Sequence, residues 1–114
     1  MSLDLPLDSL KLRLASEIDK EEFVGTVVDI QMKKDAYGRR LLQLIVESEL
    51  YGQVVIALSP SYINLLVDNL KKLGFNKLSD ILGRTFKFRR IKLPKAKKHY
   101  TDPHPRFIPV EVIQ

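Results

Sequence analysis

The chain has 114 residues, of which 45% are apolar and 29% are charged, and it contains no cysteine. This length and composition favour one globular domain and exclude a disulfide framework or a thiolate metal site. The formal net charge is +5. The first residues include no basic region followed by an apolar run, and no apolar run approaches the ~20 residues that cross a bilayer. We therefore expect a soluble cytoplasmic protein without a signal peptide.

Residues 1–22 are expected to form an N-terminal extension, as either a short helix or a strand. Four apolar residues have the spacing of one helix face, namely Leu7, Leu10, Leu14 and Ile18. The alternation of leucines with Lys11 and Arg13 is instead typical of a strand. The extension ends in an acidic run that we interpret as a solvated linker, formed by Glu17, Asp19, Glu21 and Glu22.

Three strands are predicted next, over residues 23–32, 40–47 and 53–58. Alternation in the first strand places four side chains on a common face, namely Thr26, Val28, Ile30 and Met32. Gly25 indicates a bulge or a sharp bend in this strand, and Gly38 is suited to a positive φ in the turn that follows. The second strand is apolar on both faces, which favours a strand covered on both sides. Together the three strands form a meander of two hairpins.

A helix is predicted after the third strand, because Ser59 is a suitable N-cap and Pro60 a suitable first residue. Its apolar residues recur every three or four positions, and Gly74 is suited to the position after its end. A short helical turn follows at residues 77–82. Two further strands are predicted, over residues 85–92 and 107–113. Pro109 indicates that the last strand is an edge strand or has a bulge.

The predicted order is three strands, one helix and two strands, in a mostly β domain over residues 23–114. Two stretches resemble segments of a known fold family. They are GTVVDI, a strand with a glycine, and ILGRTFKF, where a helical turn is followed by a glycine and then a strand. With this element order, the chain resembles the OB-fold nucleic-acid-binding proteins over residues 23–113. The resemblance implies a five-stranded Greek-key barrel with the helix between strands three and four. The alternative fold is an α+β sheet covered on one face by the helix.

Positive charge is concentrated between Arg84 and Lys98, where the sequence has eight lysine or arginine residues and no acidic one. Alternating phenylalanines in this stretch are typical of core residues, namely Phe86 and Phe88. Lys87 and Arg89 then point outwards, and we expect a register shift near Arg90–Ile91.

We expect the protein to bind single-stranded DNA or RNA with little sequence specificity. In OB-folds the nucleic acid lies across strands two and three, flanked by the loop between strands one and two and the loop between strands four and five. In this sequence those loops are residues 33–40 and 94–106; both are basic and contain a tyrosine. Single-strand binders use this combination of phosphate-binding cations and stacking rings. The resemblance implies that both loops lie on the same side of the barrel. The candidate nucleic-acid-binding residues are Lys33, Lys34, Tyr37, Arg39, Arg40, Lys87, Arg89, Lys95, Lys97, Lys98 and Tyr100.

The alternative function is a protein-interaction or assembly module, in which the basic segment contacts an acidic partner or a second copy of the chain. An enzyme is not expected, because the sequence has no glycine-rich phosphate loop, nucleophile elbow or paired acid and base. One group of side chains has metal-ligating chemistry, His99, Asp102 and His104, but its spacing matches no metal motif. We therefore expect no catalytic residue, no cofactor and no bound metal.

Overall fold

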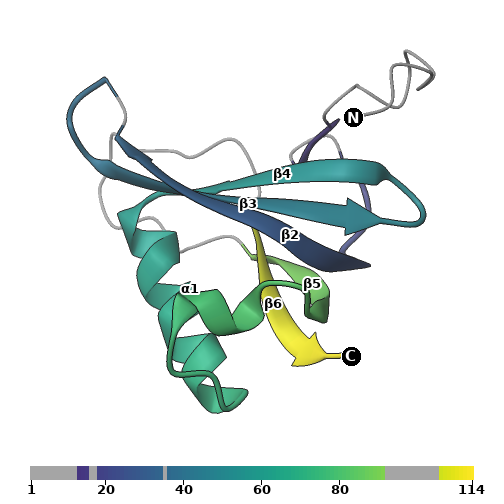
Figure 1. The fold of residues 1–114 in the computed structure, drawn as a ribbon. Coiled ribbons are helices and arrows are strands. Elements are labelled where there is room, and N and C mark those ends of the chain that lie inside the picture. The colour runs from purple at the N-terminus through teal and green to yellow at the C-terminus, as the bar shows by residue number, and fades with distance from the viewer. Residues whose placement is uncertain (1–12, 16–17, 35, 92–105) are drawn as a thin grey trace, which may run out of the picture.

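The computed structural model describes residues 13–15, 18–34, 36–91 and 106–114 (Figure 1). Its elements are β1 (Arg13–Leu14), β2 (Glu22–Lys34), β3 (Arg40–Ser48), β4 (Gly52–Leu58), α1 (Pro60–Lys72), a 3-10 helix (Leu78–Ile81), β5 (Thr85–Ile91) and β6 (Arg106–Val112). From β2 onwards, each element begins and ends close to where the sequence pattern predicts. No helix in the described ranges is long and apolar enough to span a bilayer.

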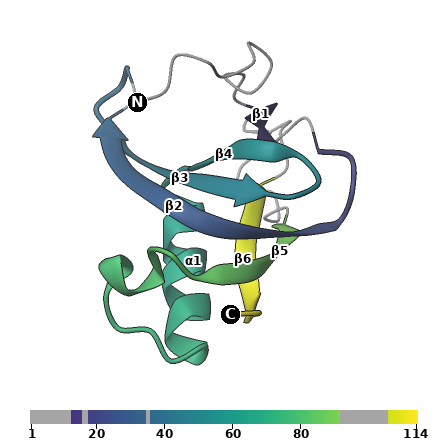
Figure 2. The same cartoon turned by 45° about the vertical axis from the view of Figure 1, so that its right-hand side comes forward.

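The strands form one sheet in the order β1-β4-β3-β2-β5-β6. Neighbouring strands are antiparallel, except that β1 and β4 are parallel. The predicted order of three strands, a helix and two strands is confirmed, and β1 is an additional short strand beside β4. The sheet curls, so that β5 and β6 lie beneath β2, β3 and β4, and α1 lies beside β6 (Figures 1 and 2).

The N-terminal segment adds to the sheet and does not form an α-helix in the part that the structure describes. Strand β1 pairs with Val54 and Val55 of β4. Ala15 and Ile18 follow it and are buried in the core. The helix and strand alternatives for residues 1–12 lie outside the described residues.

A β-bulge at Val28 changes which side chains of β2 face the core. The register with β3 shifts directly after Val27. Val27 is buried and Ile30 packs against the core, whereas Val28 is exposed. The prediction of one common face from Thr26 to Met32 is therefore wrong, because one extra residue inverts a pattern of period two.

Gly25 lies where β2 passes from one partner strand to the other. Up to Thr26 the strand pairs with β5, and from Thr26 onwards it pairs with β3. A Cβ atom at Gly25 would lie 2.3 Å from Cγ1 of Val46. The glycine therefore permits a close approach of β2 and β3, and the bulge itself lies further along β2, at Val28.

The core lies inside the curled sheet and is closed by α1. Phe86, Phe88 and Phe107 are fully buried. The rings of Phe23 and Phe88 stack with their centroids 5.2 Å apart, and Phe107 meets Phe23 edge-on at 5.0 Å. The prediction that Phe86 and Phe88 are core residues is confirmed.

Helix α1 presents one apolar face to this core. As predicted, Pro60 begins the helix and Gly74, with a φ of 95°, follows its end. Its buried residues are Tyr62, Leu66 and Leu70. Ser59 occupies the N-cap position without a side-chain hydrogen bond. The Asn69 side chain donates a 3.4 Å hydrogen bond to the Pro109 carbonyl oxygen, which connects α1 to β6.

Strand β6 ends the sheet order and contains a register shift. The shift lies between Lys87 and Phe88 of β5, and Phe88 pairs with Pro109. Both predictions for Pro109, an edge strand and a bulge, are confirmed, because proline has no N–H for the ladder. The shift expected near Arg90–Ile91 occurs earlier in β5, opposite the proline.

Candidate nucleic-acid interface

The turn between β2 and β3 gathers four exposed cations, which we call the hairpin cations: Lys33, Lys34, Arg39 and Arg40. Two of them end β2, one lies in the turn and one begins β3. Lys34 and Arg40 are direct partners in the antiparallel register, so their Cβ atoms lie about 5 Å apart on the same face. Like charges in such a pair repel each other, and an anion bound between them removes that repulsion.

Tyr37 places an aromatic ring at the tip of the same turn. The residue is 85% exposed. The guanidinium carbon of Arg39 lies 5.6 Å from the ring centroid, which is within the range of a cation–π contact. Gly38, between the two, has a φ of 79°, as predicted. An exposed ring beside several cations is an arrangement found in proteins that stack unpaired bases on aromatic side chains.

Little negative charge lies near the hairpin cations in the described part of the chain. Lys33, Lys34 and Arg40 form no ion pair with any described residue. Asp35 belongs to the same turn in the sequence and lies outside the described residues. The charges of these three cations are therefore not matched by the sheet that carries them.

The cations of β5 have a different environment, because acidic side chains on the neighbouring strands match them. Lys87 Nζ lies 3.1 Å from Glu111 Oε2 of β6, and Arg89 Nε lies 2.8 Å from Glu22 Oε2 of β2. Both ion pairs follow from the register, which sets Lys87 opposite Glu111 and Arg89 opposite Glu22. Lys87 and Arg89 point outwards as predicted, but their charges are partly neutralised within the fold.

Two further arginines of the basic stretch connect chain segments. Arg90 donates a hydrogen bond to the carbonyl oxygen of Ile18, and its Nη1 lies 3.9 Å from Glu21 Oε1. Arg84 donates a 3.1 Å hydrogen bond to the carbonyl oxygen of Gln114. Glu22 belongs to strand β2 and not to a linker, which corrects that part of the interpretation, whereas the Glu21 side chain is solvent-exposed as predicted.

The outward face of β2, β3 and β4 is mostly uncharged. The sheet register places six of its side chains there: Gln31, Leu41, Gln43, Ile45, Val55 and Ala57. Asp29 and Glu47 lie on the same face, and Lys33 lies at its hairpin end. Leu41 and Ile45 are half-buried, so the outer side of β3 is only partly covered. Among the described residues, the cations and the exposed ring therefore gather at the hairpin and not in the middle of this face.

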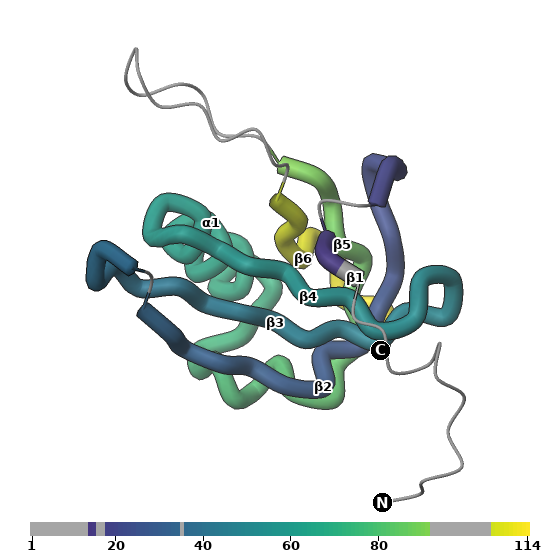
Figure 3. The backbone as a smooth tube through the Cα atoms, turned by 90° about the horizontal axis from the view of Figure 1, so that it is seen from above, coloured from purple at the N-terminus to yellow at the C-terminus, as the bar shows by residue number. Residues whose placement is uncertain are grey.

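The second predicted loop joins β5 to β6, and its structure is outside the described residues. The candidate site residues in it are Lys95, Lys97, Lys98 and Tyr100, together with His99, Asp102 and His104. Its two ends, Ile91 and Arg106, are partners in the sheet. They lie near the beginning of β2, where the Arg90 amide donates to the Glu21 carbonyl oxygen. The hairpin lies at the opposite end of β2, and the two ends are apart in Figure 3. That the two loops meet on one side stays a prediction.

Metal-ligating side chains do not cluster in the described ranges, where no group of three histidines, aspartates or glutamates could hold an ion. No protein-family model matches the sequence, and no curated protein is a detectable relative.

The ion pairs of β5 are the feature that reading the sequence missed. A signal was present: Glu21 and Glu22 come directly before the first long strand, and Arg89 and Arg90 come at the end of the fourth. In the OB-fold that the sequence predicted, these two strands are antiparallel neighbours, which brings the start of one to the end of the other. Acidic and basic pairs at those positions predict cross-strand ion pairs.

Proposed function

We propose that the protein binds nucleic acid through the β2–β3 hairpin, preferring single strands and with little sequence specificity. The observation that carries this proposal is the cross-strand pair Lys34 and Arg40, two cations on one face with Lys33 and Arg39 beside them. Cations of this kind bind phosphates and release the counterions condensed on the nucleic acid. A phosphate between Lys34 and Arg40 attracts both cations, and this attraction outweighs their mutual repulsion.

The preference for single strands rests on Tyr37. Its ring is exposed at the tip of the hairpin, beside Arg39. Bases in a duplex are stacked on one another, whereas unpaired bases have faces that an aromatic side chain can cover. Stacking of this kind accepts every base, so the site is expected to have little sequence specificity.

We also infer that the sheet is an OB-type barrel that is partly open. Five antiparallel strands follow the order β4-β3-β2-β5-β6, with α1 between β4 and β5 in the sequence. The strands at the two ends of this order, β4 and β6, approach to within 8 Å between Cα atoms. This arrangement supports a Greek-key barrel of the OB type, in which the β2–β3 turn corresponds to a ligand-binding loop.

The test is the affinity for a fluorescein-labelled oligothymidylate, measured by anisotropy at several salt concentrations. If the four hairpin cations each contact a phosphate, log K falls with log salt at a slope of about −2.8, since each contact on a single strand contributes about 0.7. The variant Lys33→Glu/Lys34→Glu is expected to have a shallower slope of about −1.4, because two of the four phosphate contacts are lost. Its affinity at 0.1 M salt is expected to fall roughly 25-fold, because each lost contact contributes about 0.7 in log K per decade of salt below 1 M.

The matched control is Lys20→Glu/Lys72→Glu, which changes the net charge equally at two exposed positions away from the hairpin. It is expected to bind within about threefold of the wild type, an effect of the overall field alone. Equal losses in both variants, or no binding of the wild type at low salt, contradict the proposal. A blunt-ended duplex of the same length measures the preference for single strands.

A second function, an assembly module, is favoured by the outward face of β3 and β4. Leu41 and Ile45 are half-buried there beside glutamines, and the face has few charges. Such a face suits self-association, since interface centres are depleted of charged residues. Sedimentation equilibrium of the wild type and of Ile45→Glu distinguishes the two functions: a dimer that the substitution dissociates supports assembly, and a monomer at all concentrations contradicts it.

A further inference from the structure

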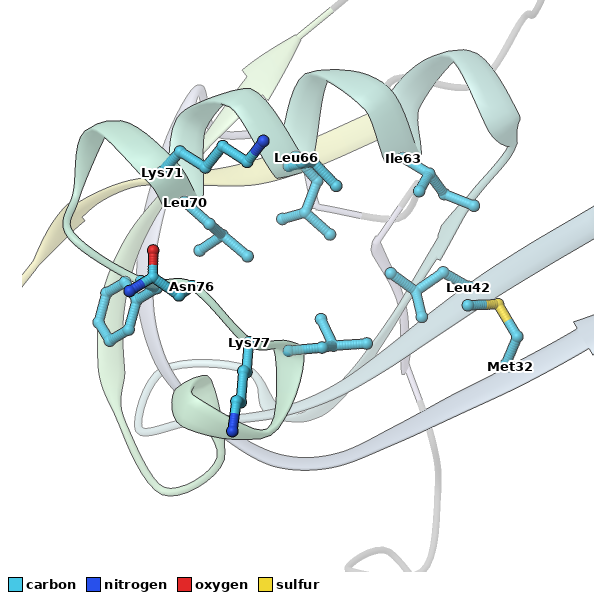
Figure 4. A pocket seen from close by; sticks show the side chains of 11 residues that line it. Met32, Leu42, Ile63, Leu66, Leu70, Lys71, Asn76 and Lys77 are labelled. Atoms are coloured by element: carbon cyan, nitrogen blue, oxygen red, sulfur yellow. The ribbon is translucent and has the colours of Figure 1, made fainter.

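A pocket of about 180 Å³ opens between α1, the 3-10 helix and the strands β2 and β3. Leu66 and Leu70 point into it from the helix, and Leu42 faces them from β3 (Figure 4). Ile63, on the helix, and Met32, on β2, lie at the same end of the pocket, with Leu42 between them in Figure 4. None of the hairpin cations lines the pocket. Lys33 lies on the opposite face of β2 from Met32, whereas Lys34 lies on the same face, two residues further along.

The walls of this pocket are apolar, and part of them is exposed. Met32 is 55% exposed and Val67 is 41% exposed. Water in an apolar pocket finds few hydrogen-bond partners, and covering apolar surface is favourable by about 25 cal/mol per Å². A ligand that fills the pocket therefore needs an apolar group.

The volume limits the size of that group. A cavity of about 150 Å³ accommodates a benzene molecule, so 180 Å³ accommodates a single leucine or phenylalanine side chain. Sites for complete small-molecule ligands are larger, at roughly 300–1,000 Å³. The pocket fits one anchoring side chain better than a cofactor or a lipid chain.

The rim of the pocket is positive. Lys71, in the last turn of α1, and Lys77, before the 3-10 helix, lie on opposite sides of it (Figure 4). No acidic residue lines the pocket in the described ranges, and neither lysine forms an ion pair with a described residue. The nearby Asp80 carboxylate accepts a hydrogen bond from the Lys77 backbone amide at 3.2 Å and caps the 3-10 helix. The occupant is therefore expected to have negative charge on both sides of its apolar group.

We propose that this pocket is a docking site for an acidic segment of a partner protein. The segment inserts one large apolar side chain between α1 and the 3-10 helix, and its carboxylates lie next to Lys71 and Lys77. This arrangement is an anchor in a pocket with a complementary charged rim, a common form of peptide recognition. Docking in the pocket does not require nucleic-acid binding, because none of the hairpin cations is among the residues that line it.

The probe is a fluorescein-labelled octapeptide with two central leucines and three glutamates on each side, titrated with the full chain. Saturable binding with a Kd below about 1 mM is expected. Replacing both leucines by alanine is expected to weaken binding at least about tenfold, since the anchor is lost. Replacing the glutamates by lysine is expected to abolish it. Equal binding of the leucine and alanine peptides, or no saturable binding up to about 1 mM, overturns the proposal.

Protein variants locate the site. Val67→Glu, which places a carboxylate at the mouth, and Lys71→Glu/Lys77→Glu are each expected to weaken peptide binding about tenfold. Leu82→Glu is the matched control, because Leu82 is an exposed apolar residue outside the pocket. Lys33→Glu is the second control, because Lys33 lies on the opposite face of β2 from Met32, and both controls are expected to bind within about twofold of the wild type. Loss of peptide binding in the hairpin variant means that the peptide binds at the hairpin, which overturns the proposal. Circular dichroism verifies that each variant is folded.

Discussion

The β2–β3 hairpin and strand β5 are both rich in lysine and arginine, but they differ in their ion pairs. Among the described residues, Lys87 and Arg89 of β5 have carboxylate partners, whereas Lys33, Lys34 and Arg40 of the hairpin have none. On β5, Lys87 and Arg89 form ion pairs with Glu111 and Glu22 at 3.1 and 2.8 Å. At the hairpin, Lys34 is set opposite Arg40, another cation. The density of charge along a sequence therefore does not show which cations are available to a ligand, because that depends on the residue opposite each cation.

An ion pair at the surface contributes little to stability, but it weakens the attraction between its cation and an anionic ligand. Exposed pairs are worth about 0–1 kcal/mol. A phosphate that binds Arg89 must compete with the carboxylate of Glu22 and lies in the field of its negative charge. A phosphate that binds between Lys34 and Arg40 meets no described carboxylate and relieves a repulsion.

The largest effect is expected on stability, from the inward side of β5. Phe88→Ala removes a fully buried ring that stacks on Phe23, and the free energy of unfolding is expected to fall by about 3–5 kcal/mol. Urea denaturation followed by circular dichroism measures it. Lys87→Ala, the neighbouring outward position, serves as the control and is expected to change stability by less than about 1 kcal/mol. A small effect of Phe88→Ala contradicts the assignment of β5 as a core strand.

The second effect compares the two basic regions directly in oligonucleotide affinity. Lys87→Ala/Arg89→Ala is expected to lower the affinity for a single strand by less than about threefold, because these cations already have carboxylate partners. Lys34→Ala/Arg40→Ala is expected to lower it roughly 25-fold at 0.1 M salt, since two phosphate contacts are lost. Anisotropy under identical conditions measures both. Equal losses from the two regions mean that net charge alone governs binding.

An effect of similar size is expected from the ring at the tip of the hairpin. Tyr37→Ala is expected to weaken single-strand binding by about 1–3 kcal/mol, the range for one stacked base, at an unchanged salt slope. Tyr37→Phe keeps the aromatic face and is expected to retain most of the affinity. The salt titration separates the two contributions, because stacking releases no counterions. A change of slope in Tyr37→Ala argues against stacking as its role.

The smallest effect concerns the ion pair between Arg89 and Glu22. A double-mutant cycle with Arg89→Ala and Glu22→Ala is expected to give a coupling free energy of about 0.2–1 kcal/mol in unfolding, reduced at 1 M salt. Glu22→Ala alone is also expected to raise oligonucleotide affinity slightly, since it releases Arg89. If Glu22→Ala instead lowers the oligonucleotide affinity, the Glu22 carboxylate does not weaken phosphate binding by Arg89.

The sequence predicted the elements of the fold well, because local patterns carry them. The alternation around Phe86 and Phe88 located a core strand, and Pro60 and Gly74 marked the ends of α1. It did not predict the faces of β2, because the bulge at Val28 depends on how β2 fits against β3. The pocket beside α1 was also not predicted, since its walls come from segments that are distant in the sequence, such as Met32, Leu66 and Leu78.

Composition and local periodicity by themselves determined that this is a mostly β domain with one helix between its third and fourth long strands. They also determined that basic residues and a tyrosine occupy the turn after the first long strand. Only the tertiary structure decided which cations are paired. The antiparallel register sets Glu22 opposite Arg89 but sets Arg40 opposite Lys34. The reason is physical: periodicity is a property of a few neighbouring residues, whereas the charge that faces a given cation is set by the register between strands far apart in the chain.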